Sequence, residues 1–465
     1  MEIEFLARIE EAVQKFKEFG HKSNKSIKIV SHLDADGICA CAILTKALSN
    51  ENRHFSISIL PQLDRRIIMS LAEDTAGLII FSDFGSGQID AIKKFLSGKK
   101  IIILDHHQPQ NETIPENFVH VNPHLFGIDG SKEISGAGVS YLFAKALNKK
   151  NRELAHLAII GAIGDNQENY GFIGINSRLL ELAERCGKIS VQNGLRLFGA
   201  NTRPIHKLLE YCFTPYIPGV TGTETGAIAF LKSLGINPKK GSKWKMLEDL
   251  TKEEQRRLLE GLILRRMNEE TPEAVYGPIY TICEETGMLR DAKEFSTVLN
   301  ACGRLDKASL GIGICLGDNT SKERVFSVVH EYKRQIMEAL KWYEEQSENI
   351  VSGEGFIIIN AKNELLPTMV GTLASIISRS VNIPAGTYIL SMARTEDFMV
   401  KVSLRIAGKA NADLNKTLGF LVERVGGQAG GHKSAAGALI PQNKEQLFVE
   451  IAKTYFARGV IEEKI

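Results

Sequence analysis

Short apolar runs alternate with amphipathic stretches over residues 1–185. The runs predict strands at 26–31, 55–60, 77–82, 100–104 and 118–121. The stretches have helical periodicity and predict helices at 2–19, 37–48, 64–74, 87–96, 138–147 and 151–163. Runs such as Gly-Leu-Ile-Ile-Phe at 77–81 lack polar alternation, which indicates strands covered on both faces. This alternation of strands and helices predicts a doubly wound parallel sheet in an α/β fold.

The pattern changes after residue 185. Residues 186–295 are mainly helical in pattern and punctuated by prolines, which indicates an inserted region with a structural or partner-binding role. A helical pattern over 321–348 predicts a connector within a return segment, 296–350. A second, smaller α/β unit follows over 351–465, with strands expected at 356–360, 387–392 and 398–405 and helices at 367–379, 411–424 and 443–457. We therefore expect domains at 1–185, 186–295, 296–350 and 351–465.

Composition indicates a globular protein without the large excess of positive charge that is typical of nucleic-acid-binding proteins. Hydrophobic residues make up 43% of the chain, charged residues 24%, and the formal net charge is +2. Binding of nucleic acid would therefore depend on a local groove rather than on overall charge. No apolar run approaches the ~18 residues that span a bilayer, so no membrane association is expected. The charged N-terminus and seven cysteines without a Cys-x-x-Cys pair favour a reducing, cytoplasmic location.

Acidic and histidine side chains follow the predicted strands of the first unit. They form four clusters, namely His32-Leu-Asp34-Ala-Asp36-Gly37, Asp83, Asp105-His106-His107 and Asp165. In doubly wound sheets, ligands bind outside the carboxyl ends of the strands. Any single aspartate here is also explained as a helix N-cap, but capping is a poor explanation for all four clusters together.

These side chains predict a two-metal centre for hydrolysis of a phosphate ester. Two divalent ions about 3.5–4 Å apart activate water and hold the charge of the phosphoryl oxygens. Asp34 and Asp36 are spaced to serve neighbouring ions, Asp83 is the candidate bridge, and Asp165 follows a helix of small residues at 159–164. A carboxylate-rich set favours Mn²⁺, or Mg²⁺, over zinc.

The histidine pair predicts two different roles. In an extended segment His106 and His107 face opposite ways, so one is expected to bind metal while the other reaches the substrate phosphate. Asp105 is a candidate for orienting a histidine rather than for direct ligation.

Glycines and cations in the second unit indicate a phosphate-binding site. Gly426, Gly427, Gly430 and Gly431 allow a backbone nest whose N–H groups converge on an anion, although a hinge or tight turn explains them as well. His432 adds a donor. Arg405 supplies a bidentate fork and Ser403 a neutral donor. Arg379 is a weaker candidate, since it also suits the C-terminus of its helix.

The motifs resemble a known family. His32-Leu-Asp-Ala-Asp-Gly37, Asp83, Asp105-His-His107 and Asp165 are similar to the four motifs of the DHH phosphoesterase superfamily. Gly430-Gly-His-Lys-Ser-Ala-Ala-Gly437 resembles the Gly-Gly-His signature of the DHH-associated C-terminal domain. Leu299-Asn-Ala-Cys-Gly-Arg304 and Ser403-Leu-Arg405 resemble RecJ segments, and the whole chain is similar to archaeal RecJ-like nucleases.

The resemblance implies roles residue by residue. The implied metal ligands are Asp34, Asp36, Asp83, His106 and Asp165, with Asp83 bridging two ions and His32 as a further possible ligand. His107 is assigned to phosphate contact or leaving-group stabilisation, and Arg304 joins the substrate-binding residues. Thr297-Val298 stands where bacterial RecJ commonly has Pro-Arg, so the 5′-phosphate is not expected to be held in the bacterial manner.

The sequence thus favours a Mn²⁺- or Mg²⁺-dependent exonuclease that hydrolyses single-stranded DNA or RNA to 5′-mononucleotides, with roles in DNA replication and repair. The resemblance implies 5′→3′ action on DNA and 3′→5′ action on RNA. One alternative is a phosphodiesterase for short oligoribonucleotides or cyclic dinucleotides. Another is a replication-fork scaffold that uses the inserted region to bind a partner, for which the resemblance suggests the GINS complex.

Overall fold

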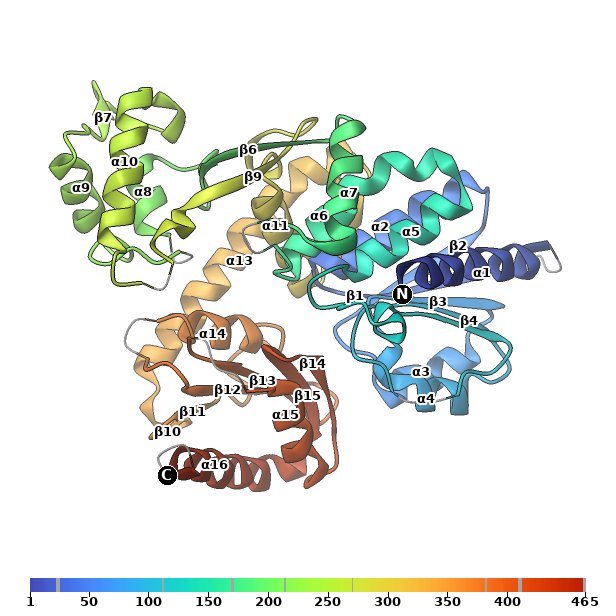
Figure 1. Cartoon of the computed structure of the whole chain (residues 1–465). Coiled ribbons are helices and arrows are strands. Elements are labelled where there is room, and N and C mark those ends of the chain that lie inside the picture. Colours follow the sequence, from blue (N-terminus) through green and yellow to red (C-terminus); the bar gives the residue numbers. More distant parts are fainter. Residues whose placement is uncertain are drawn as a thin grey trace.

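The computed structural model describes residues 1–21, 26–110, 113–168, 171–212, 215–269, 271–380, 383–408 and 412–462. Its first domain is built on a five-stranded sheet in the order β2-β1-β3-β4-β5 (Figure 1). The strands are β1 (Ile27–His32), β2 (Phe55–Leu60), β3 (Leu78–Ser82), β4 (Lys100–Leu104) and β5 (Phe118–Val121), and all pairs are parallel. The doubly wound sheet expected from the sequence is confirmed.

Helices cover both faces of this sheet because alternate residues of each strand point to opposite sides. Ile29, Ile80 and Ile102 pack under α1 (Glu2–His21), α2 (Ala35–Asn50), α5 (Gly136–Leu147) and α6 (Ala155–Gly164). Ile79 and Ile101 pack under α3 (Arg65–Glu73) and α4 (Ile89–Phe95) on the other side. The helix α7 (Gly174–Arg185) packs on α6.

The inserted region has a core of its own. That core is formed by residues between 195 and 275, and its helices are α8 (Ile205–Glu210), α9 (Glu224–Ser233) and α10 (Lys252–Arg265). A small hairpin, β7 (Lys239–Lys240) with β8 (Lys243–Trp244), projects from it. An antiparallel ribbon of β6 (Ile189–Leu195) and β9 (Tyr276–Ile282) forms the stem, which the sequence did not predict.

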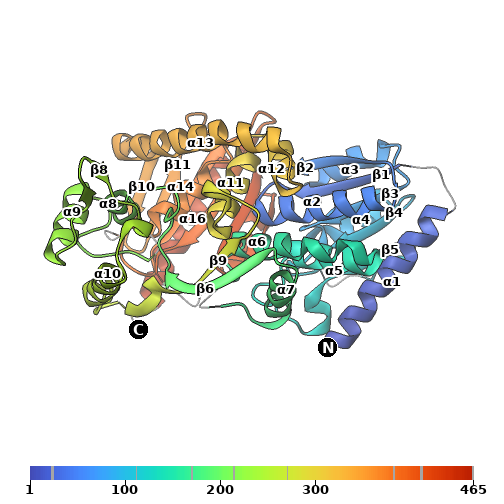
Figure 2. The ribbon, with the colours of Figure 1, turned by 90° about the horizontal axis from the view of Figure 1, so that it is seen from above.

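The return segment contributes to the first domain. Helices α11 (Ala292–Arg304) and α12 (Ala308–Cys315) pack on α2, and α11 also contacts α6, so their apolar residues lie in the core of the first domain. The long helix α13 (Asn319–Glu345) then runs from this core to the second domain (Figures 1 and 2). Only the α13 part of the return segment is a connector.

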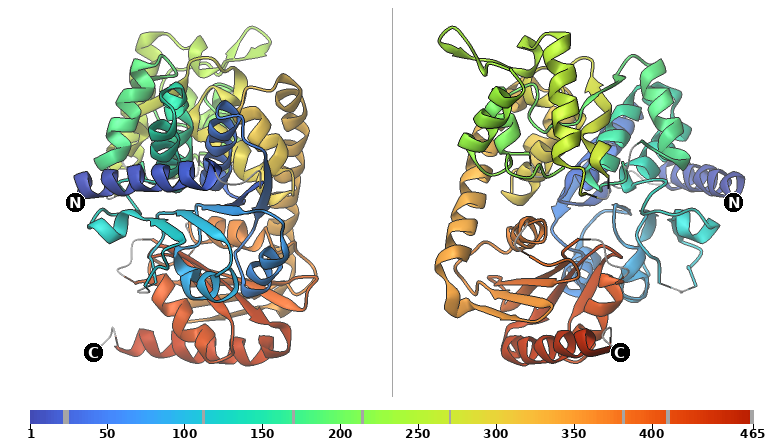
Figure 3. Two further views of the ribbon diagram at one scale, coloured as in Figure 1. Left: turned by 90° about the vertical axis from the view of Figure 1, so that its right-hand side faces the viewer. Right: turned by 60° about the vertical axis from the view of Figure 1, so that its left-hand side comes forward.

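The second domain is a six-stranded mixed sheet in the order β10-β11-β12-β13-β15-β14. Its strands are β10 (Ile350–Gly353), β11 (Phe356–Asn360), β12 (Tyr388–Arg394), β13 (Met399–Ile406), β14 (Gln428–His432) and β15 (Ala435–Pro441). Helices α15 (Leu414–Glu423) and α16 (Glu445–Glu462) pack on one face, whereas α14 (Val370–Ile377) packs on the other. Figure 3 shows α16 on the outer side of this domain, away from the insertion. Strands β10, β14 and β15 were not predicted, and residue 411 of the expected helix 411–424 lies outside the described residues.

Among the described helices, none is long and apolar enough to span a membrane.

Candidate metal centre

The candidate ligands lie where adjacent strands of the first sheet end. Asp34 follows β1 and caps α2, since its carboxylate accepts a hydrogen bond of 3.0 Å from the Gly37 amide. Asp83 follows β3 and Asp105 follows β4. Asp83 has a φ of +62°, a left-handed conformation that bulky residues avoid but aspartate and asparagine tolerate. The sheet topology and the local backbone therefore both bring these carboxylates together.

Asp36 is held in place by two glycine-rich helices. Its fully buried carboxylate accepts hydrogen bonds from the amides of Gly136 (2.6 Å) and Ala137 (3.0 Å) at the start of α5. A Cβ at Gly161 in α6 would lie 2.3 Å from Asp36 Oδ1. The small residues at 159–164 are thus explained by the close approach of α6 to this carboxylate.

The ligands fall into two groups that meet at Asp83. One group is His32, Asp34 and Asp83, and the other is Asp36, His106 and Asp165; within each, one donor atom per residue lies within 4.8 Å of the others. Asp83 Oδ2 lies 3.6 Å from His32 Nδ1 in the first group. Its Oδ1 lies 3.2 Å from His106 Nε2, which is also 3.2 Å from Asp165 Oδ2. One carboxylate therefore faces both groups.

The donor atoms suit divalent cations. Both Asp83 oxygens and His106 Nε2 are buried, yet none makes a hydrogen bond within the part of the chain that the structure describes. His106 Nδ1 lies 2.6 Å from the Gly130 carbonyl oxygen, and donation of its proton there leaves the Nε2 lone pair turned toward the carboxylates. Oxygen-rich donors with one or two imidazoles match Mn²⁺ or Mg²⁺.

Crowding of the carboxylates perturbs their protonation. Burial, together with Asp83 and Asp165, raises the pKa of Asp36 well above its usual value. Burial also raises the pKa of Asp165 to about 7. For His106, burial opposes the charged form, but Asp83 and the other carboxylates outweigh it and raise the pKa. The centre therefore needs positive charge, which bound cations would supply in place of protons.

Asp105 positions the histidine pair. Its buried carboxylate accepts hydrogen bonds from the amides of Ser86 (2.9 Å) and His106 (2.7 Å) and from Nδ1 of His107 (2.8 Å). The chain leaves the extended conformation after β4, so the rings of His106 and His107 lie 4.4 Å apart. The expectation that the two rings face opposite ways is therefore wrong.

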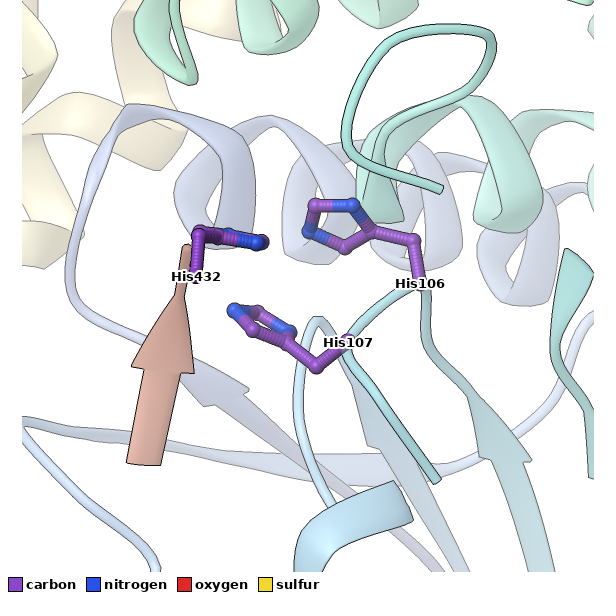
Figure 4. Close-up of side chains that lie close together, drawn as sticks. All are labelled: His106, His107 and His432. Carbon is purple, nitrogen blue, oxygen red and sulfur yellow. The ribbon is translucent and has the colours of Figure 1, made fainter. Parts of the chain in front are cut away.

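The second domain brings a third imidazole to the centre. His432, at the end of β14, stacks on His107 with ring centroids 4.6 Å apart, and it lies 5.3 Å from the ring of His106 (Figure 4). Its Nε2 is 3.8 Å from Asp165 Oδ2. Burial and His107 lower the pKa of His432, so the ring is a neutral hydrogen-bonding group.

The part of the glycine run next to His432 forms a strand. Gly430 and Gly431 belong to β14, which pairs antiparallel with β15 at the sheet edge. Gly431 has a φ of +134°, and a Cβ there would lie 2.5 Å from the Ala435 carbonyl oxygen. Gly430 and Gly431 are therefore strand residues rather than part of the expected nest, and they form the hairpin that presents His432.

Three guanidinium groups lie near one another beside α14. Arg405 Nε donates to Ser375 Oγ (3.0 Å), and Arg304 donates to the Tyr332 hydroxyl (3.0 Å) and to Thr372. Burial, with repulsion from Arg304 and Arg379, lowers the pKa of Arg405 to about 10.

Ser403 and Arg379, the other two predicted substrate-binding donors, lie in different surroundings from each other. Ser403 Oγ lies 3.2 Å from where a Gly371 Cβ would be, so the glycine leaves room over this hydroxyl. Arg379 is exposed and lies beyond the end of α14 at Ile377, rather than at the C-terminus of the expected helix 367–379.

Sequence reasoning missed several supporting side chains. Gln167 Nε2 donates to the Gly130 carbonyl oxygen (3.0 Å), the same atom that receives His106 Nδ1. Asn122 Nδ2 donates to the His107 carbonyl oxygen (2.8 Å). Gln167 lies two residues after Asp165, and this closeness to a candidate ligand could have indicated its role from the sequence. Nothing in the sequence around Asn122 indicates a role.

Comparison with known proteins identifies matching domains. Residues 26–162 match the N-terminal domain of the DHH family, residues 197–276 match the DHH-CID domain and residues 354–458 match the DHHA1 domain. An uncharacterized protein of Methanocaldococcus jannaschii is 32% identical over 460 residues, which cover 96% of this chain and 97% of that protein.

More distant likenesses extend to nucleases. The single-stranded-DNA-specific exonuclease RecJ of Dickeya dadantii is 29% identical over 155 residues, or 31% of this chain, and the match spans only 26% of that exonuclease. A crystal structure of exonuclease RecJ bound to manganese has a TM-score of 0.56 at 18% identity and covers 97% of this chain and 94% of that one. Cdc45 from Entamoeba histolytica has a TM-score of 0.66 at 12% identity, and the match covers 97% of this chain and 99% of that one. The last two show a shared fold.

Proposed function

This chain belongs to the DHH superfamily and is RecJ-like, and from that premise we propose that it is a divalent-metal-dependent exonuclease for single-stranded nucleic acid. The proposed products are 5′-mononucleotides, released 5′→3′ from DNA, with 3′→5′ action on RNA as a further property to test. The proposed setting is DNA replication and repair.

The shared carboxylate of Asp83 carries this proposal. Its two buried oxygens face His32 on one side and His106 on the other, without a hydrogen bond from the described residues. A structural carboxylate would be expected to accept several hydrogen bonds. A carboxylate that would bind two cations is not expected to make such hydrogen bonds.

Each group of residues has a role in this reaction. Mn²⁺ or Mg²⁺ would be held by Asp34, Asp83 and His32 and by Asp36, His106 and Asp165, and would supply an activated water and charge neutralisation at the phosphate. His107, oriented by Asp105, and His432 lie beside these ligands and would donate hydrogen bonds to phosphoryl oxygens.

The strand would be held between the two domains. The cations Arg405, Arg304 and Arg379, together with Ser403 and the β14 segment Gly430–His432, would contact its backbone. Backbone contacts carry little sequence information, so low sequence specificity is expected.

The test uses 20-mers of DNA and RNA labelled at either end, with Mn²⁺. Wild type is expected to release mononucleotides stepwise, and Asp83→Asn, which tolerates the positive φ, is expected to lose this activity and Mn²⁺-induced thermal stabilisation. Asp306→Asn is the matched control, because Asp306 is exposed, has a φ of +56° and belongs to neither ligand group. Equal cleavage by wild type and Asp83→Asn would refute the assignment.

A phosphodiesterase for short oligoribonucleotides or cyclic dinucleotides uses the same centre. Its discriminating result is rapid hydrolysis of dinucleotides with no cleavage of either 20-mer. The three neighbouring guanidinium groups of Arg304, Arg379 and Arg405, which lie outside the two ligand groups, favour the longer substrate.

A second role is favoured by the insertion. It has its own core on a two-stranded stem, it matches the DHH-CID domain, and the whole chain shares its fold with Cdc45. Such a module suits docking of a replication partner such as the GINS complex. Because Leu195 pairs with Tyr276, residues 196–275 can be replaced by a two-residue turn that closes the stem. Unchanged recovery of GINS by this shortened protein would remove the insertion from that role.

A further inference from the structure

Strand β13 presents a row of polar side chains that extends beyond the predicted substrate residues. Val400, Val402 and Leu404 point into the core of the second domain. Because successive side chains alternate between faces, Lys401, Ser403 and Arg405 share the opposite face. Only Ser403 and Arg405 belong to the motif found in the sequence, so Lys401 extends the row.

The row leads away from the metal centre. Leu404 pairs with Ala436 on β15, and His432 pairs with Ala435, so Arg405 lies at the His432 end of the sheet. In the other direction the strand passes Lys401 and reaches the β12–β13 hairpin tip at 395–398. At ~3.3 Å per residue the tip lies about 20 Å from Arg405.

The first domain borders the far half of this row. Lys401 Nζ donates to Gln62 Oε1 at 2.8 Å, and Gln62 follows β2 in the first domain. Lys401 forms no ion pair with any described residue. At the tip, Arg66 at the start of α3 pairs with Asp397 and neutralises its charge. A cation without a carboxylate partner, held between two domains, is positioned for an external anion.

Phe398 at the hairpin tip has a conformation and an exposure that do not stabilise the fold. Its side chain is 79% exposed, more than any other described aromatic residue. Its φ of +59° is a conformation that large side chains avoid. The tip backbone is nevertheless fixed, since the Phe398 carbonyl oxygen accepts a hydrogen bond from the Gln442 amide at 3.0 Å. The ring is thus held out into solvent at a defined place.

We propose that Phe398 is a base-stacking platform and Lys401 a backbone-phosphate contact for the part of a single strand that lies outside the metal centre. This proposal rests on the proposed nuclease function and adds the path of the strand, along β13 toward the β2 side of the first domain. Aromatic faces stack on any base, and lysine binds phosphate as a point charge. Glu396 is also exposed on the tip, so the ring and not the net charge of the tip makes the contact.

The test separates long strands from short ones. Affinity for a fluorescent thymidine 20-mer is measured in EDTA, which prevents cleavage, and kcat/KM is measured with Mn²⁺ on thymidine oligomers of 2, 3, 5, 8, 12 and 20 nucleotides. Phe398→Ala is expected to weaken 20-mer binding about 5- to 100-fold. Turnover of 2-mers and 3-mers should stay within twofold, because they do not reach the tip. Lys401→Gln should show the same dependence on length.

Three controls keep the result interpretable. Phe420→Ala removes another exposed phenylalanine, 43% exposed on α15, and should leave every length unchanged. Phe398→Asn should match or exceed wild type in melting temperature, since asparagine tolerates positive φ, while still losing 20-mer affinity. Phe398→Trp should bind the 20-mer as wild type does. The fluorescence of the new tryptophan should be quenched by the 20-mer but not by the 2-mer.

The outcomes distinguish this inference from the function on which it rests. If wild type cuts the 20-mer and Phe398→Ala matches it at every length, the strand path is wrong and the nuclease stands. If wild type cuts no oligomer and binds none, the proposed function itself fails.

Discussion

The close packing of α6 against Asp36 gives a sharp prediction for Gly161→Ala. The added Cβ would lie 2.3 Å from Asp36 Oδ1 and 2.7 Å from the Ala137 Cβ. Ordinary contact begins at 3.4 Å, so the carboxylate or the helix must move by about 1 Å. A misplacement of that size at a catalytic centre costs about 100-fold in rate.

The effect on stability is expected to be much smaller. Alanine gains about 1 kcal/mol over glycine inside a helix, whereas overpacking costs about 1–3 kcal/mol. We therefore expect Gly161→Ala to lower the free energy of unfolding by about 0–2 kcal/mol. A loss of activity far larger than the loss of stability is the signature of a displaced ligand.

The assay measures kcat/KM on a labelled 20-mer across a Mn²⁺ titration, and melting temperature in EDTA. Gly161→Ala should lower kcat/KM about 100-fold and weaken Mn²⁺ activation. Gly419→Ala is the matched control, because Gly419 lies in α15 with nothing within 4 Å of its Cβ position. It should add about 0.5–1 kcal/mol of stability without affecting activity. If Gly161→Ala keeps kcat/KM within threefold of wild type, α6 does not set the position of Asp36.

Three further predictions concern two residues of the centre and Lys401 on β13. His432→Ala should lower kcat about 10²-fold while leaving Mn²⁺-induced thermal stabilisation in place, because the ring contacts His107 and Asp165 without completing either ligand group; loss of Mn²⁺ binding would contradict this. Asp105→Asn should lower kcat more than it raises KM, since it weakens the hydrogen bond that orients His107, and an unchanged kcat would count against that role. Burial lowers the pKa of Lys401 to about 8, so 20-mer affinity should fall about tenfold as the pH rises from 7 to 9 and the amine loses its proton. Lys401→Arg should abolish this pH dependence, and binding that stays constant over the same range in wild type would contradict it.

The parts of the fold predicted well are those in which periodicity determines structure. Strands β3 and β4 are nearly continuous apolar runs and β2 alternates apolar and polar residues, and the structure confirms all five predicted strands within two residues. Parallel sheets also place strand ends at one edge, so the convergence of Asp34, Asp83 and Asp105 follows from topology. The insertion was recognised as mainly helical from the same patterns.

The parts predicted poorly depend on tertiary contacts. Strand β14 contains Gly430 and Gly431, which give no apolar alternation, so its pairing with β15 is invisible locally. The stem strands β6 and β9 are separated by the whole insertion. The stacking of His432 on His107 joins two domains far apart in the sequence, and no spacing rule predicts it without the family resemblance.

The packing of α11 and α12 on α2 has a consequence for synthesis of the protein on the ribosome. The first domain is discontinuous, because residues 292–315 complete a core that otherwise ends before the insertion. At about 5–20 residues per second, translation of the insertion takes several seconds, during which the apolar side of α2 has no α11 to cover it. The insertion has a separate core and can fold in this interval. Nascent chains are therefore vulnerable to aggregation and proteolysis until α12 has left the exit tunnel.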